Sequence, residues 1–273
     1  MSNNQGRNDE RYNIRVLDRA IRLLSVLADG KPRTLTELSE EVGLNSSTTF
    51  RLLATLGSYN FVERDRQSGR YRLGLACLEL ARVYLQGNDL RQVALAELEK
   101  LRDDTLETVH LAVLNNMEVV YLEKLEGLHA IGIMSSRVGA RAPSYCTGLG
   151  KALLAYTDPD TVRAHFERTG LHRFTGNTLT SVDRLMQELE QVRLQGYSFD
   201  RGEHEHEVRC VAAPIFDANR MLVAAISVAG PASRMEPLDT NHELIERVCR
   251  TAATISARLG YRPVGIVDRK VGA

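Results

Sequence analysis

A run of five small polar residues precedes Arg51: Asn45, Ser46, Ser47, Thr48 and Thr49. Ser, Thr and Asn are poor inside helices because their side chains compete for nearby backbone groups, so the run needs another purpose. At the start of a helix, hydroxyl groups can bind phosphate oxygens and base edges, and unpaired backbone N–H groups attract phosphate. The stretch therefore predicts contact with nucleic acid.

The flanking residues predict the elements that would present this run. Apolar spacing indicates a helix over 16–28, which Gly30 and Pro32 end. A second helix begins at Thr34, with Glu37 three residues later as a capping box, and ends at Gly43. A third helix begins at Asn45 or Ser46 and ends near Ser58. Two short helices joined by a glycine-containing turn are typical of a helix-turn-helix.

A β-hairpin is expected directly after the third helix. Residues 61–64 and 70–73 alternate apolar with polar side chains around the turn sequence "DRQSG". The order of three helices and a hairpin predicts a winged helix-turn-helix, whose second helix of the motif lies in the major groove. The predicted DNA-binding residues are Thr34, Ser46, Ser47, Thr48, Thr49, Arg51, Arg66, Gln67 and Arg70.

A second stretch with chemical potential is "CTGLGKALLA", residues 146–155, a glycine-rich turn before a helix. Its backbone N–H groups can bind an anion, or the stretch is an ordinary helix start; the residues leave both open. A catalytic alternative makes Cys146 a nucleophile with His204 as its base. A helix N-terminus would lower the pKa of that thiol.

The segment "GEHEHEVRC", residues 202–210, raises the question of a metal site. His204, His206 and Cys210 are suitable zinc ligands, with Asp200 and Cys146 as further candidates. The intervening glutamates are more typical of a solvated loop, so we expect no metal and place His204 beside a pocket rim. No motif predicts a cofactor.

Residues after 74 predict a second kind of architecture. A connecting helix spans 75–86, and further helices are expected near 90–105, 148–156, 159–168, 182–195 and 240–259. Strand-like segments lie between them, including "AIGIMS" at 130–135, "RCVAAPIFD" and "MLVAAISVAG". Strands and helices do not alternate strictly, which favours a largely antiparallel sheet flanked by helices and an α+β fold class.

Taken together, these segments resemble the IclR family of bacterial transcriptional regulators. The resemblance rests on "TLTELSEEVGLNSSTTFRLLATL", "GRYRLG", "TGLGKALLA", "GYSFDRGEHEHEVRCVAAPIFD" and "AAISVAGPASR", and it extends from about Ile14 to Tyr261. It implies a winged helix-turn-helix over 1–74, a linker helix over 75–87 and a GAF-like α/β effector-binding domain over 88–273. Asn45-Ser46 replaces the Pro-Lys that is frequent in the family, and Ala229 replaces a frequent Ser.

The resemblance also implies a pocket for a small organic acid. Matched by position, the effector-binding residues are Ile131, Met134, Ala142, Gly148, Leu149, Asp200, Val208, Cys210 and Ser227. We therefore expect a ligand-responsive regulator, a repressor in preference to an activator, and not an enzyme. An aromatic-compound-responsive activator and a protein-interaction module are the remaining alternatives.

Composition limits the setting in which such a regulator works. The chain has 273 residues, and no apolar run approaches the length of a membrane span. Its four cysteines are widely spaced without a CxxC pair, which fits reduced thiols in a cytoplasm. The expected partners are double-stranded DNA with a palindromic operator and a second copy of the chain, as a homodimer or a dimer of dimers.

Overall fold

The computed structural model describes residues 14–86, 89–128 and 134–262. The chain divides into two compact units, Met1–Gly87 and Asn88–Ala273, which are considered separately. None of the helices in the described part of the chain has the length and apolarity needed to cross a bilayer.

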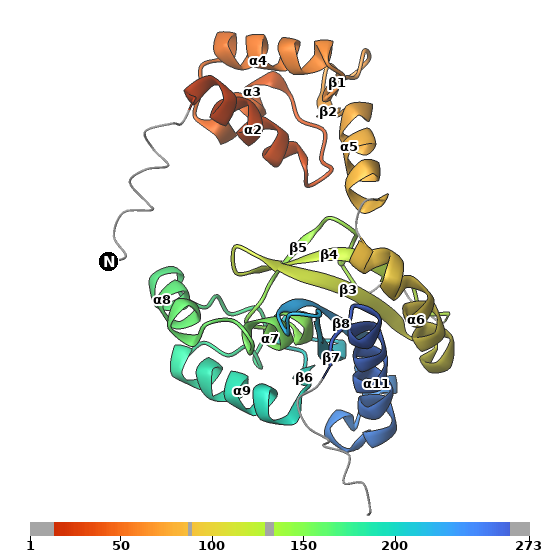
Figure 1. Ribbon diagram of the computed structural model, residues 1–273. Helices are drawn as coiled ribbons and strands as arrows, with labels where there is room; N and C mark the ends of the chain where they lie inside the picture. The colour runs from red at the N-terminus through yellow and green to blue at the C-terminus, as the bar shows by residue number, and fades with distance from the viewer. Residues whose placement is uncertain (1–13, 87–88, 129–133, 263–273) are drawn as a thin grey trace, which may run out of the picture. The chain divides into compact units, whose positions relative to one another are not determined.

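The N-terminal unit contains helices and one hairpin (Figure 1). Its elements are α2 (Arg15–Leu27), α3 (Leu35–Val42), α4 (Ser46–Ser58), β1 (Val62–Arg64), β2 (Tyr71–Leu73) and α5 (Leu75–Gln86). The strands β1 and β2 pair antiparallel, so the predicted wing is confirmed. Leu23, Leu38 and Leu53 from the three helices meet Val62 and Tyr71 of the hairpin in one core.

Local capping sets the beginnings of the two motif helices. The Thr34 hydroxyl accepts from the backbone N–H of Glu37, and the Glu37 carboxylate accepts from the backbone N–H of Thr34 at 2.6 Å, a complete capping box. Asn45 caps α4, since its Oδ1 accepts from the Thr48 N–H at 2.8 Å. The predicted helix-turn-helix is therefore present with its predicted caps.

The C-terminal unit is a six-stranded antiparallel sheet with helices on both faces (Figure 1). The strand order is β5-β4-β3-β8-β7-β6. Its elements are α6 (Asp89–Thr105), β3 (Thr108–Asn115), β4 (Glu118–Leu125), β5 (Arg141–Pro143), α7 (Gly148–Leu154), α8 (Pro159–Thr169), α9 (Val182–Gln195), β6 (Ser198–Asp200), β7 (Val208–Phe216), β8 (Leu222–Pro231), α10 (Ala232–Met235) and α11 (His242–Arg258).

Different helices cover the two faces of this sheet. Leu98 of α6 and Val248 of α11 pack with Leu111 and Val211 on one face, which forms the larger apolar core. Leu149 and Leu153 of α7 pack on the other face, and α8 and α9 lie outside α7 (Figure 1). This second face carries the pocket described below.

The predicted strand at 130–135 lies mostly outside the described residues. Of its six residues only Met134 and Ser135 are described, and these two belong to no strand. The strand at this edge of the sheet is β5, which pairs with β4 through Ala142 and Val119.

Candidate functional site

The first turn of α4 exposes part of the predicted DNA-binding set. Ser46, Ser47 and Arg51 are exposed, and Thr48 is half-buried. The Ser47 hydroxyl donates to Oδ1 of Asn45 at 2.9 Å, which holds it at the helix start. This face therefore presents small polar groups and one guanidinium group to solvent.

Thr49 is a correction to the predicted set. Its side chain is 0% exposed, and its hydroxyl donates to the backbone oxygen of Asn45 at 3.1 Å. Leu52, Leu53 and Leu56 follow Thr49 at helical spacing, so Thr49 faces the core with them. It cannot contact DNA from that position.

The polar residues of the wing have two different environments. Arg66 and Gln67 are exposed at the turn, where the Asp65 carboxylate accepts from the backbone N–H groups of Gln67 and Ser68. Arg70 instead donates to the Pro32 carbonyl oxygen at 2.9 Å and to Glu37 at 3.1 Å. Arg70 thereby fastens the hairpin to the start of α3, while Arg66 and Gln67 keep their side chains free of such ties.

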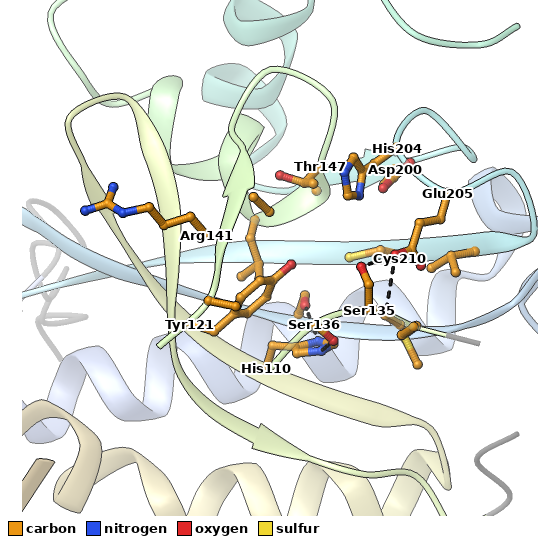
Figure 2. A pocket seen from close by; sticks show the side chains of 18 residues that line it. His110, Tyr121, Ser135, Ser136, Arg141, Thr147, Asp200, His204, Glu205 and Cys210 are labelled. Atoms are coloured by element: carbon orange, nitrogen blue, oxygen red, sulfur yellow. Dashed lines mark hydrogen bonds between the residues drawn. The ribbon is translucent and has the colours of Figure 1, made fainter. Parts of the chain in front are cut away.

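A cavity of about 70 Å³ opens on the α7 face of the sheet (Figure 2). Every predicted effector-binding residue lines it except Ile131, which lies outside the described residues. The lining residues are His110, Tyr121, Met134, Ser135, Ser136, Ala140, Arg141, Ala142, Thr147, Gly148, Leu149, Asp200, His204, Glu205, Val208, Cys210, Ser227 and Ala229.

The start of α7 forms one wall of this cavity and packs closely against the neighbouring segments. Thr147 caps the helix, since its hydroxyl accepts from the Gly150 N–H at 3.2 Å. A Cβ atom at Gly148 would lie 2.8 Å from the Sγ of Cys210, and one at Gly150 would lie 2.1 Å from the Ser144 carbonyl oxygen. Both glycines therefore allow contacts that a larger residue would prevent.

Asp200 carries a buried carboxyl group beside this wall. It ends β6, pairs in register with Cys210 of β7 and is 4% exposed. Its Oδ1 accepts from the backbone N–H of Glu203 at 2.7 Å. Burial, with a smaller contribution from the Glu203 carboxylate, raises the pKa of Asp200 to about 7, although that hydrogen bond and Lys151 act in the opposite direction. Near neutral pH the group is available in both protonation states.

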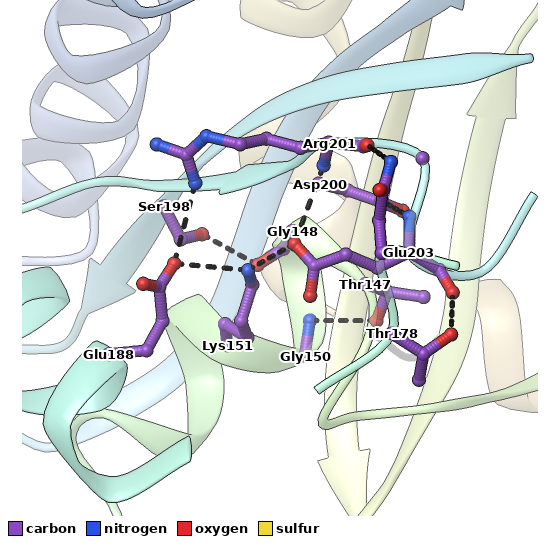
Figure 3. A network of polar contacts seen from close by, with 12 residues as sticks. Thr147, Gly148, Gly150, Lys151, Thr178, Glu188, Ser198, Asp200, Arg201 and Glu203 are labelled. Carbon is purple, nitrogen blue, oxygen red and sulfur yellow. Dashed lines mark hydrogen bonds and ion pairs between the residues drawn. The ribbon is translucent and has the colours of Figure 1, made fainter. Parts of the chain in front are cut away.

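A buried lysine lies behind this wall (Figure 3). Lys151 of α7 is 0% exposed, and its ammonium lies 2.6 Å from Glu203 and 3.1 Å from Glu188 of α9. Arg201 extends the network, at 3.5 Å from Glu188 and 2.5 Å from Asp239. The cation neutralises Glu203 and ties α7 to α9, and it does not line the pocket.

The loop 201–207 carries two lining residues, His204 and Glu205, and is held through its main chain. Thr175 and Thr178 donate to the carbonyl oxygens of Gly202 and Glu203, each at 2.6 Å. Asn177 donates to the Arg201 carbonyl oxygen at 2.8 Å. The path of this loop thus depends on three side chains of another segment.

Charge inside the pocket is unusual for an anion site. Arg141 contributes to the lining, but its guanidinium donates to Glu118 at 2.9 Å and to Asn115 at 2.6 Å. Its side chain points away from the other labelled lining residues (Figure 2). Burial lowers the pKa of His204 and keeps it neutral. Among the described lining residues, the ionisable groups that face the cavity are therefore neutral or acidic.

Several lining residues escaped sequence reasoning. The sequence analysis did not predict effector contacts for His110, Tyr121, Thr147 and Glu205. His204 was expected beside the pocket rim, and it lines the cavity. Strand alternation could place His110 on the face opposite to Val109 and Leu111, but all three are buried. Because both faces of β3 are buried, the hydrophobic pattern of the strand did not show which face His110 lies on.

The metal and nucleophile hypotheses find no geometric support. No group of three His, Cys, Asp or Glu side chains within the described ranges is arranged to hold a metal ion. His206 is exposed and pairs with Glu207. Cys146 is 0% exposed, is not among the lining residues, and burial raises the pKa of its thiol, so the thiolate needed for attack is disfavoured.

Two family comparisons cover both units. The sequence model of the IclR helix-turn-helix domain matches residues 16–66, and that of the bacterial transcriptional regulator IclR C-terminal domain matches residues 82–257. The chain belongs to the IclR family of bacterial transcriptional regulators. Members of the IclR family regulate transcription in response to ligands and are not enzymes, which removes the Cys146-dependent alternative.

Individual relatives in the IclR family match over most of their length. The transcriptional regulator KdgR of Escherichia coli is 35% identical over 239 residues, 88% of this chain and 90% of KdgR. The transcriptional repressor IclR of E. coli is 36% identical over 225 residues, 81% of this chain and 82% of that protein. An IclR homolog from Microbacterium hydrocarbonoxydans, solved in complex with 4-hydroxybenzoate, is 29% identical with a TM-score of 0.77, over 89% of this chain and 98% of that one.

Proposed function

We propose that the chain is a cytoplasmic repressor whose operator binding changes when a small oxygenated organic acid enters the pocket of the C-terminal unit. The observation that carries this proposal is the convergence of the predicted effector residues. Gly148, Asp200, Cys210 and Ser227 come from four different elements and line one cavity. Repression is favoured because relatives such as the E. coli IclR protein are repressors.

The chemistry of the cavity favours an acid that also carries a hydroxyl or carbonyl oxygen. We infer that its carboxylate faces the backbone N–H groups at Gly148 and Leu149, because the N–H groups at a helix start attract anions. Asp200 would accept from a ligand hydroxyl when ionised, or donate to a ligand oxygen when protonated. With a volume of about 70 Å³, the cavity favours a small molecule.

A second candidate effector class is an aromatic hydroxy acid. The M. hydrocarbonoxydans homolog is complexed with 4-hydroxybenzoate, a ring with a carboxylate and a hydroxyl group. Such a ligand has the same polar groups as an aliphatic hydroxy acid, and Tyr121, Met134 and Val208 offer apolar contact to a ring. The two classes differ in size and not in the polar contacts that they require.

The DNA-binding half of the proposal uses the exposed groups of α4 and the wing. Ser46, Ser47 and Thr48 would meet phosphates or base edges in the major groove, and Arg51 would contact a phosphate. Arg66 and Gln67 would reach the DNA backbone or minor groove from the wing turn. Thr34 and Arg70, which hold α3 and the wing in place, would support these contacts beside the DNA.

A second copy of the chain is the proposed partner. Val16, Leu17 and Ile21 of α2 are 62%, 56% and 53% exposed, and Leu78 and Val83 of α5 are 67% and 59% exposed. Exposed apolar clusters of this kind mark protein interfaces. A homodimer or a dimer of dimers would then match a palindromic operator, because the symmetry of the site mirrors that of the protein.

The test combines ligand binding with operator binding by the full-length chain. Titration calorimetry against hydroxy acids, keto acids and aromatic acids identifies the effector class, and fluorescence anisotropy with DNA from upstream of its own gene reads the response. We expect an oxygenated acid to bind, to change operator affinity and to lose both effects in Asp200→Ala. Binding only of aromatic compounds without an acid group, indifferent to Asp200→Ala, would rule this chemistry out.

A further inference from the structure

His110 lies on the side of the pocket away from Asp200 (Figure 2). It is 3% exposed and stands opposite Ser227 in the antiparallel register of β3 and β8. Its Nε2 lies 2.9 Å from the hydroxyl of Ser136, and its Nδ1 lies 3.4 Å from that of Ser227. The ring contacts Tyr121, with 5.3 Å between centroids. Both ring nitrogens are therefore held by hydroxyl groups at the pocket surface.

The imidazole of His110 and the two hydroxyl groups that hold it are polar but uncharged. Burial, followed by the positive charge of Lys124, lowers the pKa of His110 to about 3, so the imidazole is neutral. Lys124 pairs with His110 across β3 and β4, but its ammonium donates to the Ser136 carbonyl oxygen at 3.0 Å and lies 3.5 Å from Glu126. Lys124 is not among the residues that line the cavity.

A neutral imidazole gives its two serine partners opposite roles. One ring nitrogen carries a proton and the other carries a lone pair, so one serine accepts from the ring and the other donates to it. When the proton is on Nδ1, Ser227 accepts from the ring and can donate its own proton into the pocket. When the proton is on Nε2, Ser227 donates to the ring and offers lone pairs. The tautomer of His110 thus decides what Ser227 presents to a ligand.

We propose that His110 is a specificity-determining residue: with Ser136 and Ser227 it recognises one uncharged oxygen, a hydroxyl or a carbonyl, on the part of the effector that lies away from Gly148. This proposal rests on the function proposed above and assigns the second polar contact of the same ligand. A hydroxyl suits either tautomer because it both donates and accepts. A methyl group would displace water without replacing its hydrogen bonds, and a carboxylate would require several donors where this group supplies one.

The experiment uses the full-length chain and two matched ligand series. The aliphatic series is 4-hydroxybutyrate, butyrate and succinate, and the aromatic series is 4-hydroxybenzoate, benzoate and terephthalate. Within each series only the far group changes, from hydroxyl to hydrocarbon to carboxylate. Titration calorimetry compares the wild type with His110→Phe, which keeps a ring, and with Ser136→Ala, a loop substitution that tests the same group if His110→Phe does not fold. His242→Phe, at an exposed position on α11, is the control.

We expect the wild type and His242→Phe to bind the hydroxyl member of at least one series about three- to tenfold more tightly than the other two members. In His110→Phe and Ser136→Ala this ratio should fall to about one. Equal binding of all three members by the wild type, tightest binding of the dicarboxylate, or an unchanged ratio in the folded variants would overturn the assignment of His110 alone. Failure of the wild type to bind any member would overturn the organic-acid function and this inference with it.

Discussion

The backbone N–H of Glu203 donates to the Asp200 carboxyl group at 2.7 Å, while the Glu203 carboxylate lies 2.6 Å from the ammonium of Lys151. The residue that orients the acidic group of the pocket is thus itself anchored to α7. The positive charge of Lys151 also lowers the pKa of Asp200, which burial raises, without direct contact between the two side chains.

Lys151→Met should destabilise the C-terminal unit. Removing one partner of a buried ion pair leaves an uncompensated charge and typically costs about 3–5 kcal/mol. Urea unfolding followed by circular dichroism measures the loss, and Lys100→Met, an exposed position on α6, is the matched control. Equal midpoints for the two variants would show that Lys151 does not stabilise this network.

Asp200 should make both the stability of the fold and the binding of ligand depend on pH. Its pKa in the folded chain, about 7, lies above the ordinary value, so the folded state binds more protons than the unfolded state between about pH 4 and pH 7. Stability therefore falls as pH rises through that window, and the loss is complete above it.

For an anionic effector that accepts from protonated Asp200, affinity should weaken by up to about tenfold per pH unit above pH 7. Titration calorimetry from pH 6 to about pH 8.5 checks this, and Asp200→Asn should remove the dependence. A pH profile in the wild type that matches that of Asp200→Asn would exclude proton uptake by Asp200. Affinity that instead rises in the wild type as pH increases through 7 would favour a ligand hydroxyl that donates to the ionised carboxylate.

Gly148→Ala should abolish or strongly weaken effector binding. The added Cβ would lie 2.8 Å from Cys210 Sγ, so the Cys210 side chain or the start of α7 must shift at the pocket wall. Gly176→Ala is the control, because a Cβ there meets nothing within 4 Å. Thermal unfolding of both variants separates a blocked pocket from a misfolded unit, and retained affinity in Gly148→Ala would contradict the assignment of this wall.

Arg51 and Ser47 should affect operator binding differently. Arg51→Ala should weaken binding to all sequences and reduce the salt slope by roughly one, as expected for one phosphate contact. Ser47→Ala should alter preference among operators by about 1–3 kcal/mol if a base contact is lost. Anisotropy titrations at several salt concentrations distinguish the two effects, and unchanged binding by both variants would refute the role of α4.

Thr49→Ala should act on stability and not on recognition. Its hydroxyl is buried and donates to the Asn45 carbonyl oxygen, so its loss should cost about 1 kcal/mol of helix stability. Operator preference should remain that of the wild type. A change in preference among operators of equal length, without a change in unfolding midpoint, would restore Thr49 to the DNA-binding set.

Local chemistry made much of the N-terminal unit predictable. The capping box of Thr34 and Glu37 and the cap at Asn45 depend on residues within three positions, and the sequence displays them directly. Whether Thr49 faces solvent or the core depends on the packing of α4, and composition alone does not reveal that. The residue type of Thr49 suggested that its hydroxyl contacts DNA, but the packing of α4 buries that hydroxyl.

The pocket was predictable only where the family resemblance reached. Gly148, Asp200 and Cys210 were assigned by matching positions, since no local signal joins three segments so distant in the chain. His110 and Ser136 meet because β3 fixes one of them and the segment after 133 returns over the sheet. Such a meeting depends on strand register, which periodicity does not specify.

Thr175, Asn177 and Thr178 hold the loop that carries His204 and Glu205 by donating to the main-chain carbonyl oxygens of residues 201–203. These three bonds do not involve the side chains of His204 and Glu205, which line the pocket. A lineage could therefore replace side chains beside the pocket, and with them the preferred metabolite, while the loop keeps its course. In this arrangement the freedom to acquire a new inducer is a property of Thr175, Asn177 and Thr178, residues that do not line the pocket.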